Sequence, residues 1–138
     1  MSTSSIQDEV EDLVEEFDLL DDWEQRYKYL IDMGKALAPL DPSEKNDITK
    51  VKGCVSQVWL VHEPDGDEHV FRAESDAHIV KGLAALLVRL YSGRSGGDIL
   101  SIDAREVLQR IGLAEHLSPQ RSNGLASMIN RIQAVAAG

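Results

Sequence analysis

Residues 55–74 read VSQVWLVHEPDGDEHVFRAE and predict a β-hairpin. The first part, 55–62, is rich in the β-branched and aromatic residues that are typical of a strand. Pro64-Asp65-Gly66 follows as a turn, because proline pre-sets φ and glycine accepts a positive φ. Residues 68–74 then alternate between two faces, which predicts the returning strand.

A second β-prone stretch, ITKV at 48–51, precedes this hairpin, and Gly53 separates the two. We therefore expect a three-stranded antiparallel meander. Its first turn, around Lys52-Gly53-Cys54, would place the chain's one cysteine at a sheet edge or a loop tip.

Apolar residues at helical spacing predict helices on both sides of the strands, so the fold class is α+β. Before the strands we expect a helix through Ile6 and Phe17 that Ser4 or Ser5 caps, and a helix from Trp23 to Leu37 that Asp21 or Asp22 caps. Directly after them we expect a helix from Ile79 to Tyr91 that Ser75 or Asp76 caps, and then a helical turn over 98–102. A short helix from Asp103 to Ile111 should end at Gly112, and a last helix should begin at Ser118-Pro119 and run to about Ala136.

The formal net charge of −10 is concentrated at one end of the 138-residue chain. Residues 1–25 hold ten acids and no Lys or Arg, whereas the rest of the chain is neutral. A solvated outer helix face is the simpler interpretation, and a steering surface for a basic partner is the alternative. Without a basic stripe, nucleic acid and anionic membranes are not expected partners.

Length and composition predict one domain over 1–138, with 1–22 as an acidic N-terminal helix. The N-terminus lacks a basic and an apolar region, so we expect no secretory signal. The longest apolar run, 82–88, is too short to span a bilayer. A cytoplasmic setting follows as the default, and one cysteine excludes a disulfide or a four-thiolate site within the chain.

Cys54 has two interpretations, a small buried hydrophobe or a reactive thiol. The reactive interpretation is favoured, because Cys54 follows Gly53 between β segments and because Lys50 and Lys52 are nearby cations that favour a thiolate. No histidine stands at a spacing that indicates a Cys/His hydrolase. His62 and His69 are expected to face each other across the hairpin, although two histidines alone make a poor metal site.

Arg121 lies in the first turn of the last predicted helix, where the helix dipole disfavours a cation. Its compensating partner is either structural, with Asp76 as the candidate, or an anionic sulfur or a partner's carboxylate. Gly124 follows inside the same helix at a cost of about 1 kcal/mol. It indicates a close backbone approach to the sheet or the Cys54 loop.

Several blocks of the chain resemble the SufE family of sulfur acceptors in iron–sulfur cluster assembly. The run VKGCVSQVW at 51–59 looks like the family's Gly-Cys-x-Ser-x-Val-Trp signature. The other similar blocks are RY at 26–27 with IDMG at 31–34, FRAESDA at 71–77, VKGL at 80–83, YSG at 91–93 and LSPQRSNGL at 117–125. The similarity spans about residues 23–133, in order.

The resemblance implies a SufE/IscU-like α+β fold and a sulfur carrier that has no turnover of its own. Cys54 would take sulfur from the persulfide of a cysteine desulfurase, either SufS-like or CsdA-like. It would stimulate that enzyme and pass the sulfur to a SufBCD-like scaffold. No resident cofactor or metal is implied, since the pyridoxal phosphate would belong to the desulfurase.

The resemblance also implies residues that support the site or contact a partner: Lys52, Gly53, Ser56, Gln57, Trp59, Asp76, Arg121, Asn123 and Gly124. Trp59 would wall a shelter for the persulfide, although a core tryptophan is the favoured interpretation, and helix capping explains Asp76 nearly as well. The alternative function is a non-catalytic interaction domain in which Cys54 is structural.

Overall fold

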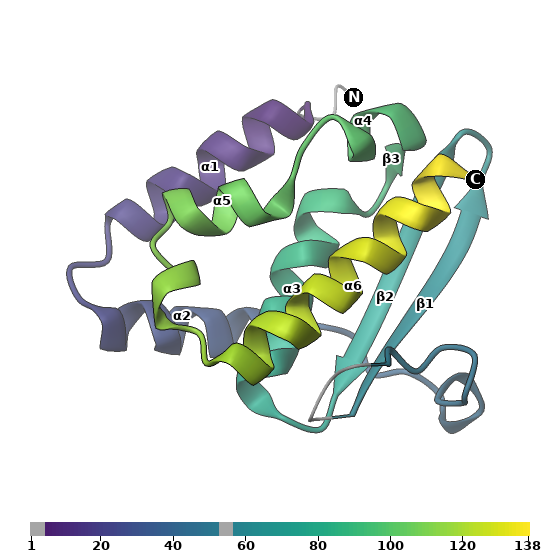
Figure 1. The fold of residues 1–138 in the computed structure, drawn as a ribbon, viewed down its shortest axis with the longest axis horizontal. Coiled ribbons are helices and arrows are strands. Elements are labelled where there is room, and N and C mark those ends of the chain that lie inside the picture. Colours follow the sequence, from purple (N-terminus) through teal and green to yellow (C-terminus); the bar gives the residue numbers. More distant parts are fainter. Residues whose placement is uncertain (1–4, 53–56) are drawn as a thin grey trace.

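The computed structural model describes residues 5–52 and 57–138. The fold is α+β, as predicted (Figure 1). The elements in chain order are α1 (Ile6–Asp18), α2 (Trp23–Lys35), η1 (Pro42–Glu44), β1 (Val58–Asp65), β2 (Glu68–Ser75), α3 (His78–Tyr91), β3 (Arg94–Ser95), α4 (Gly96–Leu100), α5 (Ala104–Arg110), η2 (Ala114–His116) and α6 (Pro119–Ala137).

The sheet has the order β1-β2-β3 and is antiparallel throughout. The predicted hairpin is confirmed, with a register that runs from Val58 opposite Ser75 to Asp65 opposite Glu68. The predicted first strand at 48–51 is wrong, because Lys50 makes only an isolated bridge to Trp59. The third strand is β3, a strand of two residues where the sequence analysis above predicts no strand.

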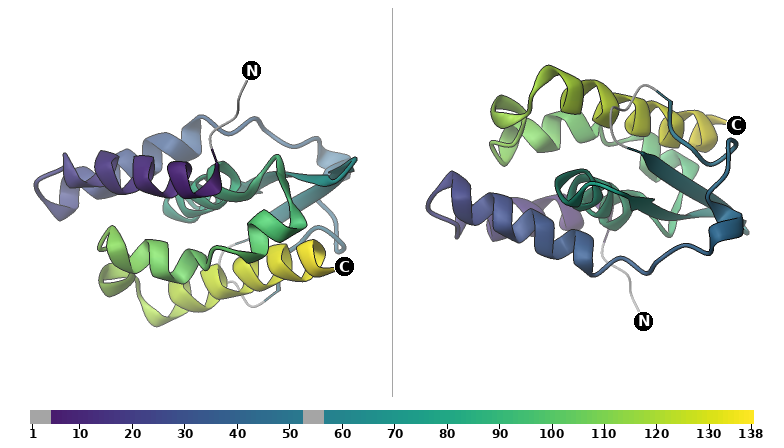
Figure 2. Two further views of the ribbon diagram at one scale, coloured as in Figure 1. Left: turned by 90° about the horizontal axis from the view of Figure 1, so that it is seen from above. Right: turned by 90° about the horizontal axis from the view of Figure 1, so that it is seen from below.

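The elements form three layers, with α3 and the sheet in the middle (Figure 2). Helices α1 and α2 cover one side, and α4, α5 and α6 cover the other. Helices α2 and α3 touch backbone to backbone, because a Cβ on Gly34 would lie 2.8 Å from the Gly82 nitrogen. The wide apolar face of α3 therefore forms the centre of the core, with Leu83, Leu86, Leu87, Leu90 and Tyr91 all buried.

Four of the predicted helix caps are confirmed, since each side chain accepts a hydrogen bond from a backbone N–H in the first turn. They are Ser5 on α1, Asp22 on α2, Asp103 on α5 and Ser118 on α6. Gly112 ends the helical segment after α5 with a φ of 77°. The local signals at these ends were sufficient because the capping bonds lie within three residues of the cap.

Three acids of the helix α1 form ion pairs with the rest of the domain, whereas Asp8, Asp12, Glu15 and Asp18 are exposed, as expected for a solvated face. Arg89 on α3 donates to Glu9 at 2.9 Å and to Glu16 at 2.7 Å. Arg110 on α5 donates to Glu11 at 2.9 Å. These pairs place α1 against α3 and α5.

No helix in the part of the chain that the structure describes has the length and apolar character needed to cross a membrane.

Candidate functional site

The predicted nucleophile Cys54 lies outside the described residues, together with Gly53, Val55 and Ser56. The site is therefore built from the two backbone arms beside it, defined as residues 50–52 and 57–59. The Val51 N–H donates to the Val58 carbonyl at 2.8 Å. Both valine side chains are buried in the core. The two arms are therefore held together by this backbone hydrogen bond and by the packing of the two valines.

The arm that follows Cys54 is held at Gln57 by the end of β2. The Asp76 carboxylate accepts from the Gln57 N–H at 3.0 Å, and the Asp76 N–H donates to the Gln57 carbonyl at 3.2 Å. The Ser75 hydroxyl donates to the same carbonyl at 2.8 Å. Three hydrogen bonds thus fix one residue of backbone.

These bonds correct the predicted cap of α3. Its N-cap residue is Ala77, which has no side-chain capping bond. The Ser75 hydroxyl accepts from the Ala77 N–H at 3.2 Å, whereas the Asp76 carboxylate faces Gln57. Asp76 therefore supports the arm of the cysteine segment.

The arm that precedes Cys54 is held by Arg131 on α6. Its guanidinium donates to the Thr49 carbonyl at 3.0 Å, to the Lys50 carbonyl at 2.9 Å and to the Ile48 carbonyl. Sequence reasoning missed this residue, because an arginine on a helix gives no signal for carbonyl groups that are more than 80 residues away. Lys50, Lys52 and Arg131 also line a shallow depression of about 390 Å³.

Trp59 is half-buried and is not part of the core. Alternation along β1 places it on the face opposite Val58 and Leu60, which are buried. Lys45 lies 5.4 Å from its ring centroid and pairs with Glu74 at 2.5 Å. The Lys45 ammonium holds the pKa of Glu74 below its ordinary value.

Arg121 pairs with Tyr27 rather than with the expected Asp76. Its Nη1 donates to the Tyr27 hydroxyl at 2.6 Å. Beside this pair, the ring of Trp23 stacks on His116 with centroids 3.9 Å apart. The start of α6 therefore presents an exposed guanidinium that an aromatic cluster of α2 and η2 orients.

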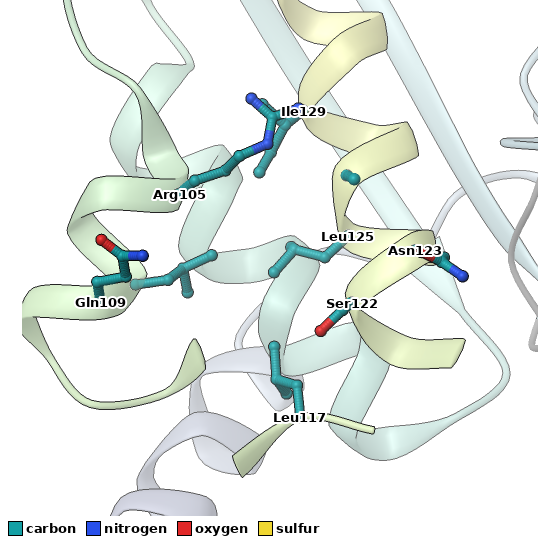
Figure 3. A pocket seen from close by; sticks show the side chains of 9 residues that line it. Arg105, Gln109, Leu117, Ser122, Asn123, Leu125 and Ile129 are labelled. Atoms are coloured by element: carbon teal, nitrogen blue, oxygen red, sulfur yellow. The ribbon is translucent and has the colours of Figure 1, made fainter. Parts of the chain in front are cut away.

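Asn123 and Gly124 follow in α6, the first exposed and the second buried. Asn123 belongs to the wall of a pocket of about 330 Å³ between α5 and α6. Figure 3 shows Gln109, Leu117 and Leu125 around it. The residues that line this pocket are mainly apolar and include no acid or histidine, so they offer no general base.

His62 and His69 face each other as predicted, with Nε2 of the first 2.8 Å from Nδ1 of the second. Burial and then the charge of His69 lower the pKa of His62. Among the described residues, no three His, Asp or Glu side chains are grouped so that they could hold a metal ion.

The comparisons with known proteins give the family. A solution structure of a hypothetical protein from Thermus thermophilus has the same fold, with a TM-score of 0.77 over 94% of this chain and 93% of that one at 23% identity. An uncharacterized SufE-like protein of Rhizobium etli is 47% identical over 90% of this chain and 86% of its own length. Another, of Rhizobium meliloti, is 45% identical over 94% and 95%. The model of the SufE Fe-S metabolism associated domain matches residues 11–136, and the chain belongs to this SufE family of iron–sulfur metabolism.

Proposed function

We propose that this protein is a sulfur acceptor, which takes sulfur from the persulfide of a cysteine desulfurase onto Cys54 and passes it to an iron–sulfur scaffold. The observation that carries the proposal is the anchoring of both arms beside the only thiol of the chain. Asp76 and Ser75 hold Gln57 on one side, and Arg131 holds the carbonyls of 48–50 on the other. Two fixed arms lower the cost of ordering the chain when a partner docks at this place.

The transfer step is a thiol–persulfide exchange with no net oxidation. The Cys54 thiolate attacks the outer sulfur of the donor persulfide, and a new S–S bond forms on Cys54. The donor's S–S bond breaks, and its bonding pair stays on the donor sulfur, which leaves as a thiolate. Cys54 thereby becomes the persulfide, and the donor cysteine is free for another catalytic cycle.

The charges near the arms favour the attacking form of the thiol. Lys52 is exposed two residues before Cys54, and Lys50 is half-buried four residues before it. Nearby cations favour a thiolate over a thiol. The Asp76 carboxylate, which accepts from the Gln57 N–H, opposes this effect as one negative charge against the two lysines.

The partners in this proposal are proteins on either side of the carrier. The donor is a pyridoxal-phosphate desulfurase of the SufS-like or CsdA-like kind, and the acceptor is a SufBCD-like scaffold. The carrier accelerates the desulfurase because it removes the sulfur that blocks the donor cysteine. Residues 1–138 would act as a single domain in this role.

The decisive experiment is intact mass spectrometry after incubation with an active cysteine desulfurase and free cysteine. The wild-type chain is expected to gain the mass of one sulfur atom, which a reductant removes. Cys54→Ser is the control and should gain none while keeping its fold by circular dichroism. An unmodified wild-type chain beside an active desulfurase would support the alternative, an interaction domain with a structural Cys54.

A further inference from the structure

The depression of about 390 Å³ beside α6, here called the cationic depression, gathers three positive charges in one place. They are the side chains of Lys50, Lys52 and Arg131, and the polar residues that line it with them are Asp47, Ser127 and Asn130. Three cations stand against one carboxylate, so the depression is positive. This sign is opposite to that of the whole chain, whose formal net charge is −10.

The fold itself does not neutralise these three cations. The ion pairs among the described residues all involve other lysines and arginines, and residues 1–4 and 53–56 contain no acid. Arg131 donates to the carbonyls of 48–50, which are neutral acceptors, so its full charge remains. By contrast, Arg72 and Arg89 are each matched by two carboxylates. The positive charge of the depression is therefore left for a ligand.

The amide of Asn130 adds a hydrogen-bond donor to the same place. Nη2 of Arg105 donates to Oδ1 of Asn130 at 2.7 Å, which leaves the amide NH₂ group of Asn130 to donate elsewhere. Ser127 differs, because its hydroxyl donates to the Asn123 carbonyl at 3.1 Å. Apart from Ser127 and Asp47, the polar side chains of the depression are donors, which suits a ligand with acceptor oxygens.

The form of the depression favours several linked carboxylates over one free anion. An ion pair at an exposed position contributes little, so a single small ion would be held weakly. A phosphate site usually offers backbone N–H groups or an arginine fork, and the fork of Arg131 is already used by carbonyls. Several weak pairs become useful together when one chain carries all the anions. A nucleic acid is not favoured, because the net charge of this chain would repel it.

We propose that the cationic depression binds an acidic segment of a partner protein, in which neighbouring Asp or Glu carboxylates pair with Lys50 and Lys52 and face the charge of Arg131. This inference goes beyond the proposed function, because the binding needs no sulfur transfer. Opposite charges across an interface raise the rate of association. The two lysines on the arm before Cys54 would thus recruit the partner.

The first test titrates the full chain with a hexaglutamate peptide at low ionic strength and follows the backbone amides by NMR. We expect shifts at 47–52 and 127–131. The double variant Lys50→Gln/Lys52→Gln should bind the peptide about fivefold more weakly. The matched control is Lys28→Gln/Lys81→Gln, which also removes one exposed and one half-buried lysine and should bind as wild type does.

Asp47 supplies a variant with the opposite sign. Asp47→Asn removes the one carboxylate of the depression and should tighten hexaglutamate binding about twofold. A gain of affinity cannot come from a loss of folding, so this variant keeps the test informative if the lysine variants are destabilised. An unchanged or weaker affinity in Asp47→Asn would count against the proposal.

Other outcomes would overturn the proposal directly. Equal weakening in the two double-lysine variants would mean that only the net charge matters. Inorganic phosphate that gives the same shifts at the same concentration would indicate a site for an adventitious ion only. Self-association at low salt that the double variant Lys50→Gln/Lys52→Gln abolishes, measured by sedimentation velocity, would assign the depression to the acidic α1 of a second copy.

The last arm identifies the partner. Desulfurase activity is measured against the concentration of this chain, the carrier, and unloading is measured against the concentration of scaffold. A several-fold higher half-saturating concentration for Lys50→Gln/Lys52→Gln in either assay supports the proposal and names the protein that carries the acidic segment. A lower maximal rate at unchanged half-saturation in both assays would reflect the thiolate of Cys54 and would overturn the proposal. If the wild-type chain gains no sulfur, the proposed function fails, while the hexaglutamate titration still decides this inference.

Discussion

The Asp76 carboxylate accepts the backbone N–H of Gln57 at 3.0 Å, and the Asp76 N–H returns a bond to the Gln57 carbonyl at 3.2 Å. This reciprocal pair joins the start of the α3 region to the arm that leaves Cys54. Asp76 therefore makes two of the three hydrogen bonds that hold Gln57, and Ser75 makes the third. A carboxylate in this place combines a charge-assisted bond with an exposed position.

Loss of the Asp76 tether should make Cys54 more reactive. For an exposed charge-assisted bond worth about 1 kcal/mol, Asp76→Ala should speed alkylation of Cys54 by iodoacetamide about fivefold, with Asp76→Asn between it and wild type. Rates are followed by intact mass over a range of pH. A pure charge effect would shift the midpoint of the pH profile, whereas a lost tether raises the rate throughout.

Asp67→Ala is the control for this series, because Asp67 is exposed in the turn at the other end of the same hairpin. It should alkylate at the wild-type rate. Identical rates for Asp76→Ala and wild type would show that the bond to Gln57 does not limit access to Cys54.

The orientation of Arg121 by Tyr27 gives a second prediction. If Arg121 contacts the desulfurase, Arg121→Ala should raise the half-saturating carrier concentration several-fold, about 1 kcal/mol of docking energy. Tyr27→Phe should raise it only about twofold, because the guanidinium keeps its charge and loses only its bond to the hydroxyl. Urea unfolding of Tyr27→Phe should differ from wild type by less than about 1 kcal/mol. An unchanged half-saturation in Arg121→Ala would remove this residue from the docking surface.

The helices were largely predictable from the sequence because their signals are local. Ser5, Asp22, Asp103 and Ser118 cap the helices that their positions predict. The sheet was less predictable. Strand β3 has two residues, too few for any alternation, and it exists because α3 returns the chain beside β2.

The candidate site was less predictable from the sequence than the helices. The sequence indicated Asp76, but it could not separate a helix cap from a tether, since both need a carboxylate just before a helix. It offered no indication of Arg131, whose partners are carbonyl groups at 48–50. Backbone acceptors have no sequence signature, so contacts of this kind require coordinates.

The close contact between α2 and α3 at Gly82 predicts that a side chain at this position destabilises the fold. A Cβ on Gly82 would lie 2.8 Å from the carbonyl carbon of Leu30, which is backbone and cannot give way cheaply. Gly82→Ala should therefore lower the free energy of unfolding by about 3 kcal/mol, measured by urea denaturation.

Gly97→Ala in α4 is the matched control, because a Cβ there meets nothing within 4 Å. It should be neutral or stabilising by up to about 1 kcal/mol. Similar losses in both variants would show that the contact with Leu30 is not the cause of the loss.

The ion pair between Glu16 and Arg89 predicts how acid acts on α1. Hydrogen bonds from Arg89 hold the pKa of Glu16 below its ordinary value. A carboxylate with a depressed folded-state pKa stabilises the fold above its unfolded-state pKa of about 4.3, and this contribution is lost as the pH falls through the folded-state value. Glu16→Gln should thus cost about 1 kcal/mol at pH 7, and the difference from wild type should vanish in stronger acid. Glu15→Gln, which removes an exposed neighbour on the same helix, should show no such convergence. Urea unfolding, followed by circular dichroism from neutral to acidic pH, measures the free energy of unfolding of both variants. A loss of stability in Glu16→Gln that persists in acid would contradict the assignment to the ion pair with Arg89.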